Sequence, residues 1–103
     1  MKNMNQLMRQ AKKMQEEILK AQASLAEQVV EGTAGGGAVK VRMNGHKDVV
    51  AVEIDKSVVS LDDVEMLQDL ILVAIQDASQ KANDLAEQVM GKYTRGLNLP
   101  GMF

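Results

Sequence analysis

Two apolar stripes at helical spacing constrain the fold more than any other feature of the sequence. In the first stripe, apolar residues recur in alternating steps of three and four, which is the heptad spacing of helices that pack side by side. A weak capping box formed by Asn3 and Gln6 marks its start, and the helical pattern ends before Gly32. The spacing predicts one helix of about seven turns. The stripe comprises Met4, Leu7, Ala11, Met14, Ile18, Ala21 and Leu25.

The second stripe predicts another long helix in the last third of the chain. Ser60 and Asp63 have the spacing of a capping box that would start this helix, and Gly91 is typical of a helix end. Residues 70–75 (LILVAI) are apolar on every side, so we expect this segment to be enclosed on more than one side. The stripe comprises Val64, Leu67, Ile71, Ala74, Ala78, Ala82, Leu85 and Val89.

The predicted helices are longer than the body of so small a protein. Each is about 40 Å long at 1.5 Å per residue, whereas a compact domain of about 100 residues has a diameter of about 33 Å. The helices should therefore overhang the body with their apolar stripes uncovered, and must pair with each other, with a second subunit, or with both. We favour both. The sequence thus predicts a homodimer, with Leu70, Ile71, Ala74 and Ile75 at its interface.

The segment between the helices alternates apolar and polar residues as β-strands do. Residues 38–44 and 49–55 follow this pattern on either side of Asn44-Gly45, a dipeptide favoured in hairpin turns. A short strand over 28–33, followed by the glycine-rich turn, would complete a three-stranded antiparallel sheet. We therefore expect an α+β fold. On the inner face of the last strand we expect Val50, Val52 and Ile54.

Composition excludes several classes of function. A single Phe, a single Tyr and no Trp leave no aromatic platform for stacking on bases, and the absence of Cys excludes disulfides and thiolate metal sites. The longest apolar run, residues 70–75, is too short to cross a bilayer, and the N-terminus has no apolar signal segment. We expect a cytoplasmic protein without a membrane partner.

Charge is segregated along the chain although the net charge is only −2. Residues 1–20 hold five basic and two acidic side chains, whereas residues 57–90 hold one Lys and seven Asp or Glu. The five basic residues occupy heptad positions b, c and f, opposite the apolar seam, where they predict a surface for DNA phosphates. The alternative is a solvated face joined by i,i+4 pairs such as Lys12 with Glu16. The predicted DNA-binding residues are Lys2, Arg9, Lys12, Lys13 and Lys20.

No pattern indicates catalysis. The run Gly35–Gly37 leads into a strand and lacks the Lys and Ser or Thr of a phosphate-binding loop, so a plain turn is expected. His46 has no second His or Cys at ligand spacing and is expected to be an exposed turn residue. The methionines lie mostly on apolar helix faces, where they fill gaps in packing. We therefore predict no catalytic residue, metal, cofactor or small-molecule substrate.

Five blocks of the sequence, taken in order, match the pattern of one known family. They are residues 8–18, 30–45, 52–59, 63–78 and 96–103. Through these blocks the chain resembles the YbaB/EbfC family of nucleoid-associated DNA-binding proteins over nearly its whole length. The resemblance implies an α-β-β-β-α fold, a tweezer-like homodimer that binds DNA through its helical arms, and a protein that is not an enzyme. Lys56 departs from the family pattern, which usually has Pro there.

Two functions follow as hypotheses. The leading one is a homodimeric protein of the nucleoid that binds double-stranded DNA with little sequence specificity and contributes to nucleoid organisation, with gene regulation left open. The other is a prefoldin-like chaperone or scaffold, because helix, β-hairpin and helix also describe such subunits. A basic outer stripe on the arm favours DNA, whereas exposed a and d residues would favour protein clients. Residues 1–90 are the expected domain and 91–103 an extended or flexible tail.

Overall fold

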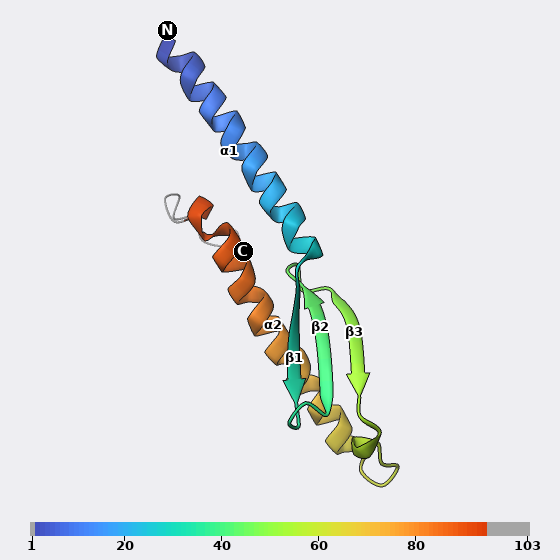
Figure 1. Ribbon diagram of the computed structural model, residues 1–103. Helices are drawn as coiled ribbons and strands as arrows, with labels where there is room; N and C mark the ends of the chain where they lie inside the picture. Colours follow the sequence, from blue (N-terminus) through green and yellow to red (C-terminus); the bar gives the residue numbers. More distant parts are fainter. Residues whose placement is uncertain (1, 95–103) are drawn as a thin grey trace.

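The computed structural model of the protein describes the backbone of residues 2–94 and the side chains of residues 3–93. Its order of elements confirms the predicted α-β-β-β-α arrangement (Figure 1). The three strands form one antiparallel sheet in the order β1-β2-β3. The elements are α1 (Lys2–Glu27), β1 (Val29–Ala34), β2 (Val39–Asn44), β3 (Val49–Ile54), the short 3-10 helix η1 (Lys56–Val58) and α2 (Val64–Thr94).

Glycines form the first turn of the sheet, and an asparagine side chain organises the second. Gly35–Gly37, between β1 and β2, have φ angles of 63°, 69° and 96°, which glycine adopts without a steric penalty. Between β2 and β3, the Asn44 side-chain oxygen accepts hydrogen bonds from the backbone of His46 and Asp48, at 2.9 and 3.0 Å. The second turn is therefore a four-residue loop organised by one buried asparagine.

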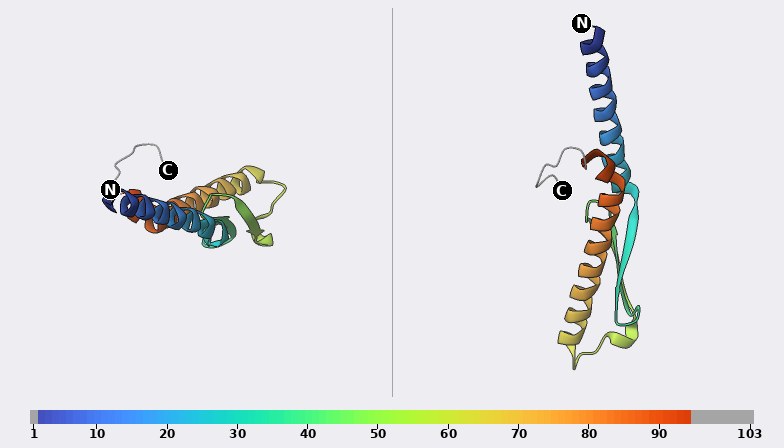
Figure 2. Two further views of the ribbon diagram at one scale, coloured as in Figure 1. Left: turned by 90° about the horizontal axis from the view of Figure 1, so that it is seen from above. Right: turned by 90° about the vertical axis from the view of Figure 1, so that its left-hand side faces the viewer.

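Helix α2 lies directly on β1 and β2 and forms the main core with them. Figure 2 shows the two layers edge-on, with α2 against one face of the sheet. The approach is close enough that a Cβ added at Gly32 would lie 2.2 Å from the Ala78 nitrogen and 2.3 Å from the Ala74 oxygen. Small residues on both elements thus allow backbone to pack on backbone. The buried residues are Ala34, Val39, Val41, Met43, Ala74, Ala78 and Ala82.

Strand β3 lies outside this core, which corrects one expectation. Val52 pairs with Val41 and Ile54 with Val39, so these side chains point to the inner face as predicted. They are nevertheless 49% and 38% exposed, and Val50 is 54% exposed. The reason is that α2 is a single helix that packs mainly against β1 and β2. Strand β3 is therefore an apolar edge strand that the chain itself leaves uncovered.

The outer edge of β1 is covered by side chains of α2. The Asp77 carboxylate accepts a hydrogen bond from the Thr33 N–H at 2.9 Å, and the Lys81 ammonium donates to the Glu31 carbonyl at 2.9 Å. Lys81 also forms an ion pair with Asp77 at 3.2 Å. The N–H of Thr33, and then Lys81, hold the pKa of Asp77 below its usual value. This pair blocks the β1 edge, so in the part of the chain that the structure describes β3 is the open edge of the sheet.

Helix α1 extends beyond the body as a projecting arm, which the comparison of helix length with domain size predicted. Its C-terminal half packs on the end of α2 in a second cluster built around Leu25, Met90 and Tyr93. Its N-terminal half is uncovered (Figure 1), with Met4 68% and Leu7 64% exposed. The molecule consequently measures 74 × 23 × 16 Å, with a radius of gyration of 19.5 Å, compared with about 13 Å for a compact domain of this length.

Both ends of α2 differ from the sequence-based expectation. Asp63 accepts from the Met66 N–H at 3.1 Å and caps the helix, whereas Ser60 accepts from Asp62 in the turn before it. The predicted boundary at 90/91 falls inside α2, which ends at Thr94. Burial of Met90 and Tyr93 against α1 outweighs the cost of about 1 kcal/mol for a glycine within a helix. Residues 95–103 of the predicted tail lie outside the described residues.

We predict that Gly32→Ala destabilises the fold by about 3 kcal/mol, because the new methyl group meets the rigid backbone of α2. Gly36→Ala is the control. A Cβ at position 36 has no atom within 4 Å, so its cost is limited to about 1 kcal/mol for a side chain at the φ of +69° that Gly36 adopts. Urea unfolding followed by circular dichroism measures both. Equal losses in the two variants would show that the close approach at Gly32 does not determine stability.

We also predict that Asp77→Asn lowers the midpoint of urea unfolding at pH 7, because it removes the ion pair with Lys81. A depressed pKa stabilises the fold above the ordinary value of 3.8 and ceases to do so as the pH falls through the lowered pKa. The difference from wild type should therefore be constant near neutrality and shrink below pH 3.8. Asp84→Asn, which removes a carboxylate that accepts from Gln80 of the same helix, is the charge-matched control at pH 7. Equal losses in the two variants would contradict a specific role of the Asp77 ion pair.

Candidate nucleic-acid interface

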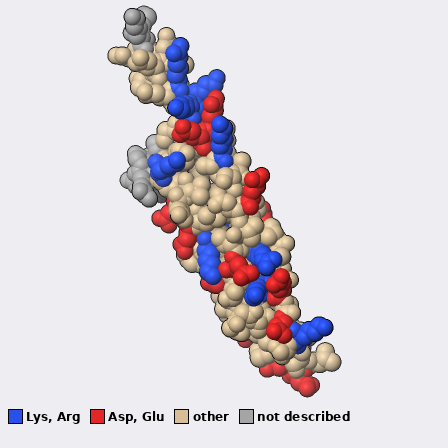
Figure 3. Space-filling view, in the orientation of Figure 1, with Lys and Arg blue, Asp and Glu red and all other residues tan. Residues whose placement is uncertain are grey.

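The predicted basic residues lie along the projecting arm. The side chains of Arg9, Lys12, Lys13 and Lys20 are all exposed on α1. Lys2 belongs to the same helix, but its side chain is outside the described residues. Figure 3 shows Lys and Arg on the arm with acidic residues beside them, and both kinds of charge mixed over the body below. The heptad pattern explains this placement, because α2 covers the apolar seam at Leu25 and leaves the opposite face to solvent.

None of the four described basic side chains of the arm is within ion-pair distance of a carboxylate. Among the residues whose side chains are described, the ion pairs are Arg42 with Glu31, Arg42 with Glu53, and Lys81 with Asp77, all on the sheet and α2. The i,i+4 pairs that would stitch the arm, such as Lys12 with Glu16, are not formed. The ammonium and guanidinium groups therefore present their donors to solvent, as phosphate binding requires.

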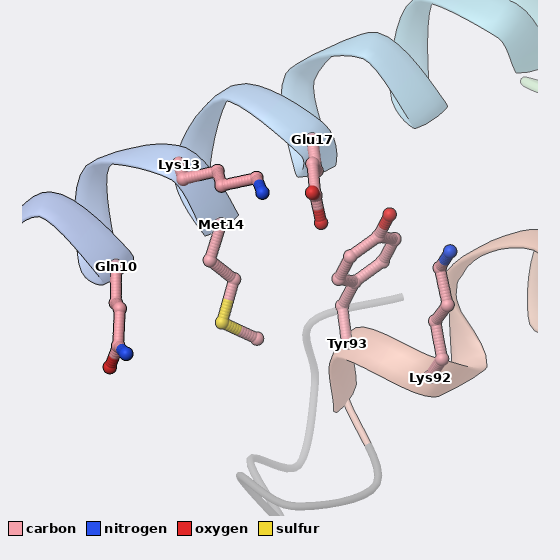
Figure 4. Close-up of a pocket in the computed structure, with 6 residues that line it drawn as sticks. All are labelled: Gln10, Lys13, Met14, Glu17, Lys92 and Tyr93. Carbon is pink, nitrogen blue, oxygen red and sulfur yellow. The ribbon is translucent and has the colours of Figure 1, made fainter.

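A cleft between the two helices brings one more lysine to this surface. It has a volume of about 390 Å³, and Lys13 of α1 and Lys92 of α2 both line it (Figure 4). The Lys92 ammonium lies 4.9 Å from the centre of the Tyr93 ring, within range of a cation–π contact. The remaining lining residues, Gln10, Met14 and Glu17, belong to α1. The basic surface thus continues from the arm onto the end of α2.

Lys92 was missing from the predicted set. The sequence places it beside a glycine near a helix end, where a basic residue usually complements the helix dipole. Only the packing of Met90 and Tyr93 on α1 shows that this helix end lies against the middle of the arm. The sequence signal for Lys92 was its place between Met90 and Tyr93, two apolar residues near the end of the helix.

The β2–β3 turn fixes the direction of the arm. The Gly45 N–H donates to the Leu25 carbonyl, and the His46 Nε2 lies 2.8 Å from the Gln22 carbonyl. Because a carbonyl can only accept, Nε2 carries the hydrogen in this contact. A Cβ at Gly45 would lie 2.7 Å from the Leu25 oxygen, so the approach requires glycine. His46 is exposed, as expected, and it also binds the C-terminal turns of α1.

The four residues predicted for the dimer interface lie on the side of α2 that faces the sheet of the same chain. Ala74 is fully buried there, and Leu70, Ile71 and Ile75 are partly buried against the same core. In the same segment, Leu72 and Val73 are 55% and 50% exposed, so the segment is not enclosed on every side. Any partner that covers this turn of α2 must contact Leu72 or Val73 in addition to the partly buried residues.

The described residues contain no group of three or more His, Cys, Asp or Glu side chains placed to hold a metal ion. In the part of the chain that the structure describes, no helix is long and apolar enough to cross a membrane.

Fold and surface together define a small α+β protein with a projecting basic helix. The model of the YbaB/EbfC DNA-binding family matches residues 1–97, and the chain belongs to this family. The family is one of DNA-binding proteins and not of enzymes.

Relatives are similar over nearly the whole chain. A nucleoid-associated protein of Bacillus thuringiensis (strain Al Hakam) is 54% identical over 101 residues, covering 98% of this chain and 93% of the relative. A nucleoid-associated protein of Alkaliphilus metalliredigens (strain QYMF) is 48% identical, covering 98% and 89%. The crystal structure of an uncharacterized protein from Helicobacter pylori has the same fold, with a TM-score of 0.73 and 24% identity over 86% of this chain and 94% of that one.

Proposed function

We propose that the protein binds double-stranded DNA as a homodimer, with little sequence specificity, and contributes to organising the nucleoid in the cytoplasm. The observation that carries this proposal is the set of exposed, unpaired basic side chains along a projecting helix in a member of a DNA-binding family. Lysine and arginine side chains bind phosphates by displacing condensed counterions, which does not depend on base sequence. The predicted contacts are Lys2, Arg9, Lys12, Lys13 and Lys20, to which the cleft adds Lys92.

Low specificity follows from the kinds of side chain on the arm. Discrimination among bases needs donors and acceptors held rigidly against a groove. Lysine is a flexible point charge, and Arg9 is the only residue of the predicted set that can form a two-pronged contact with guanine. The arm is therefore suited to bind the phosphate backbone of many sequences.

The chaperone-like alternative is not favoured. The a and d residues at the start of the arm are exposed in the single chain, which is the feature that we associated with protein clients. The family, however, is a DNA-binding one, and the same helix presents a basic face opposite these residues. An uncovered apolar face is also what a protein that assembles with its own copies would show before assembly.

We propose that the open edge of β3 forms part of the homodimer interface. The Asp55 N–H donates to the Ala38 carbonyl of the chain's own sheet. Because backbone groups alternate along a strand, those of Val52 and Ile54 point away from β2 and remain available at the edge. An unpaired apolar edge favours pairing with another chain. The exposed Leu72 and Val73 of α2, with the partly exposed Leu70, Ile71 and Ile75, extend the same proposal.

We predict that DNA binding weakens steeply with salt. Four to six effective phosphate contacts per dimer, at about 0.9 each, give a slope of log affinity against log salt of about −4 to −5. Reversing both Lys12 and Lys13 to Glu should lower the affinity and flatten this slope, while circular dichroism and dimer mass stay unchanged. Fluorescence anisotropy with a labelled duplex measures both quantities.

The matched control for the arm is the double reversal of Lys47 and Lys56 to Glu. It changes the net charge equally but lies on η1 and on the β2–β3 turn, which contacts the C-terminal turns of α1 and not its projecting half. It should retain most of the affinity and the wild-type slope. Equal losses in the two double variants would mean that overall charge, and not the arm, determines binding, and wild-type behaviour of the Lys12/Lys13 variant would exclude the arm.

We further predict that Val52→Asp converts a micromolar dimer into a folded monomer of 11.2 kDa. The side chain is 49% exposed in the single chain, so the charge should be tolerated until a partner buries it. Leu19→Asp, at a side chain that is 59% exposed on α1, is the control and should remain dimeric. Analytical ultracentrifugation measures the mass. A wild-type monomer throughout the micromolar range would refute the homodimer, and a dimeric Val52→Asp variant would refute this interface.

A further inference from the structure

An uncovered apolar strip runs along the projecting half of α1. We call it the arm strip. Two of its residues, Met4 and Leu7, are 68% and 64% exposed, and Met8 is 66% exposed. The same seam is partly buried from Ile18 onwards, where α2 packs against it. The arm strip consists of Met4, Leu7, Met8, Ala11 and Met14.

The strip continues an established helix–helix contact. From Met4 to Met14 the seam extends for about 15 Å at 1.5 Å per residue, in the heptad register that the Ile18 end of the seam uses against α2. Its uncovered part begins where α2 ends, beside the cleft that Tyr93 and Met14 line. Another helix could therefore pack on the part of the α1 seam that lies beyond the end of α2.

We propose that the arm strip pairs with the arm strip of a second copy of this chain. In a coiled coil, the residues at positions e and g flank the seam and determine which helices can pair. With Met4 at a, the flanking positions within the strip are Met8, Gln10 and Gln15, which are uncharged, and the first charged flanking residue, Glu17, lies beyond Met14 at the α2 end of the strip. Two identical arms can therefore meet along the strip without like-charge repulsion, and Met8 widens the apolar contact.

The charges of the arm are compatible with this pairing. Arg9, Lys12 and Lys13 occupy positions f, b and c, on the face away from the seam. Pairing through the strip leaves these side chains exposed, so one helix can contact another copy and a DNA phosphate at the same time. The self-association itself does not depend on DNA.

The strip and the β3 edge lie in different parts of the elongated molecule (Figure 1). If β3 forms the dimer, as proposed above, the arm strip gives each dimer a second set of self-association surfaces. A chain with two separate self-association surfaces can bind one copy through the first and another copy through the second. Such contacts can join dimers into larger assemblies. Such assemblies would hold separate DNA segments together.

The test compares the same substitution on and off the strip. Leu7→Gln removes a large apolar side chain from the seam, whereas Leu19→Gln removes one that is similarly exposed, at 59%, but lies at position b. Both side chains are on the surface, so both variants should fold. Sedimentation equilibrium over a range of concentrations, without DNA, measures the average mass of each variant and of the wild type, in the native chain and in the Val52→Asp background.

We expect the wild type to exceed the mass of a dimer as its concentration rises. Leu7→Gln should weaken this step about tenfold, as expected for loss of one buried leucine side chain, while Leu19→Gln leaves it unchanged. In the Val52→Asp background, which should be monomeric at micromolar concentration, the weaker association at higher concentration should depend on Leu7 in the same way. This background separates the arm strip from the β3 edge, so one proposal can fail without the other.

Three outcomes would overturn the proposal. The wild type could stay dimeric at all concentrations, Leu7→Gln could associate as the wild type does, or Leu19→Gln could be equally weakened. Duplex affinity measured in parallel should change less than twofold in Leu7→Gln, which keeps a failure of DNA binding distinct from a failure of arm pairing.

Discussion

The close approach of α2 to β1 determines most of the structure. At Gly32 the strand backbone touches the helix backbone at Ala74 and Ala78, with no side chain between them. An element packed so closely cannot shift sideways without a clash, because protein interiors have few voids that would accommodate the movement. This contact fixes which strands α2 covers, which edge of the sheet it blocks and where its far end meets α1.

Each exposed surface follows from that placement. Centred on β1 and β2, α2 reaches the β1 edge with Asp77 and Lys81 and leaves β3 uncovered. Its far end carries Met90 and Tyr93 to the C-terminal half of α1 and no further. Among the described residues, two of the apolar regions that this placement leaves uncovered are the edge strand β3 and the projecting half of α1. Both are surfaces that a second chain can bury, which a body only 16 Å thick cannot do for itself.

The sequence predicted the helices and strands because each of them has a local pattern of apolar and polar residues. Heptad spacing gave both helices, and alternation with turn residues gave the three strands. The sequence could not predict the features that depend on contacts between elements far apart along the chain. Val52 and Ile54 would be buried only if a helix lay over β3. The alternating pattern of a strand is the same whether or not a helix covers it. The end of α2 was misplaced at Gly91 because contacts with α1 override a local preference, and the same contacts bring Lys92 to the cleft, which no local pattern indicates.

Helix α1 shows how a protein with a net charge of −2 can present a surface for DNA. Average charge governs long-range behaviour only where opposite charges are mixed, since salt screens interactions beyond about 8 Å at physiological ionic strength. Here the acidic residues are concentrated on α2 and the body, while Arg9, Lys12 and Lys13 lie on an arm that projects from them. Distance therefore isolates the basic face from most of the acidic charge, and the length of the helix matters to function as much as its composition. The same projection uncovers the apolar seam on the opposite side, so a long arm that binds phosphate in this way also needs a partner for its seam.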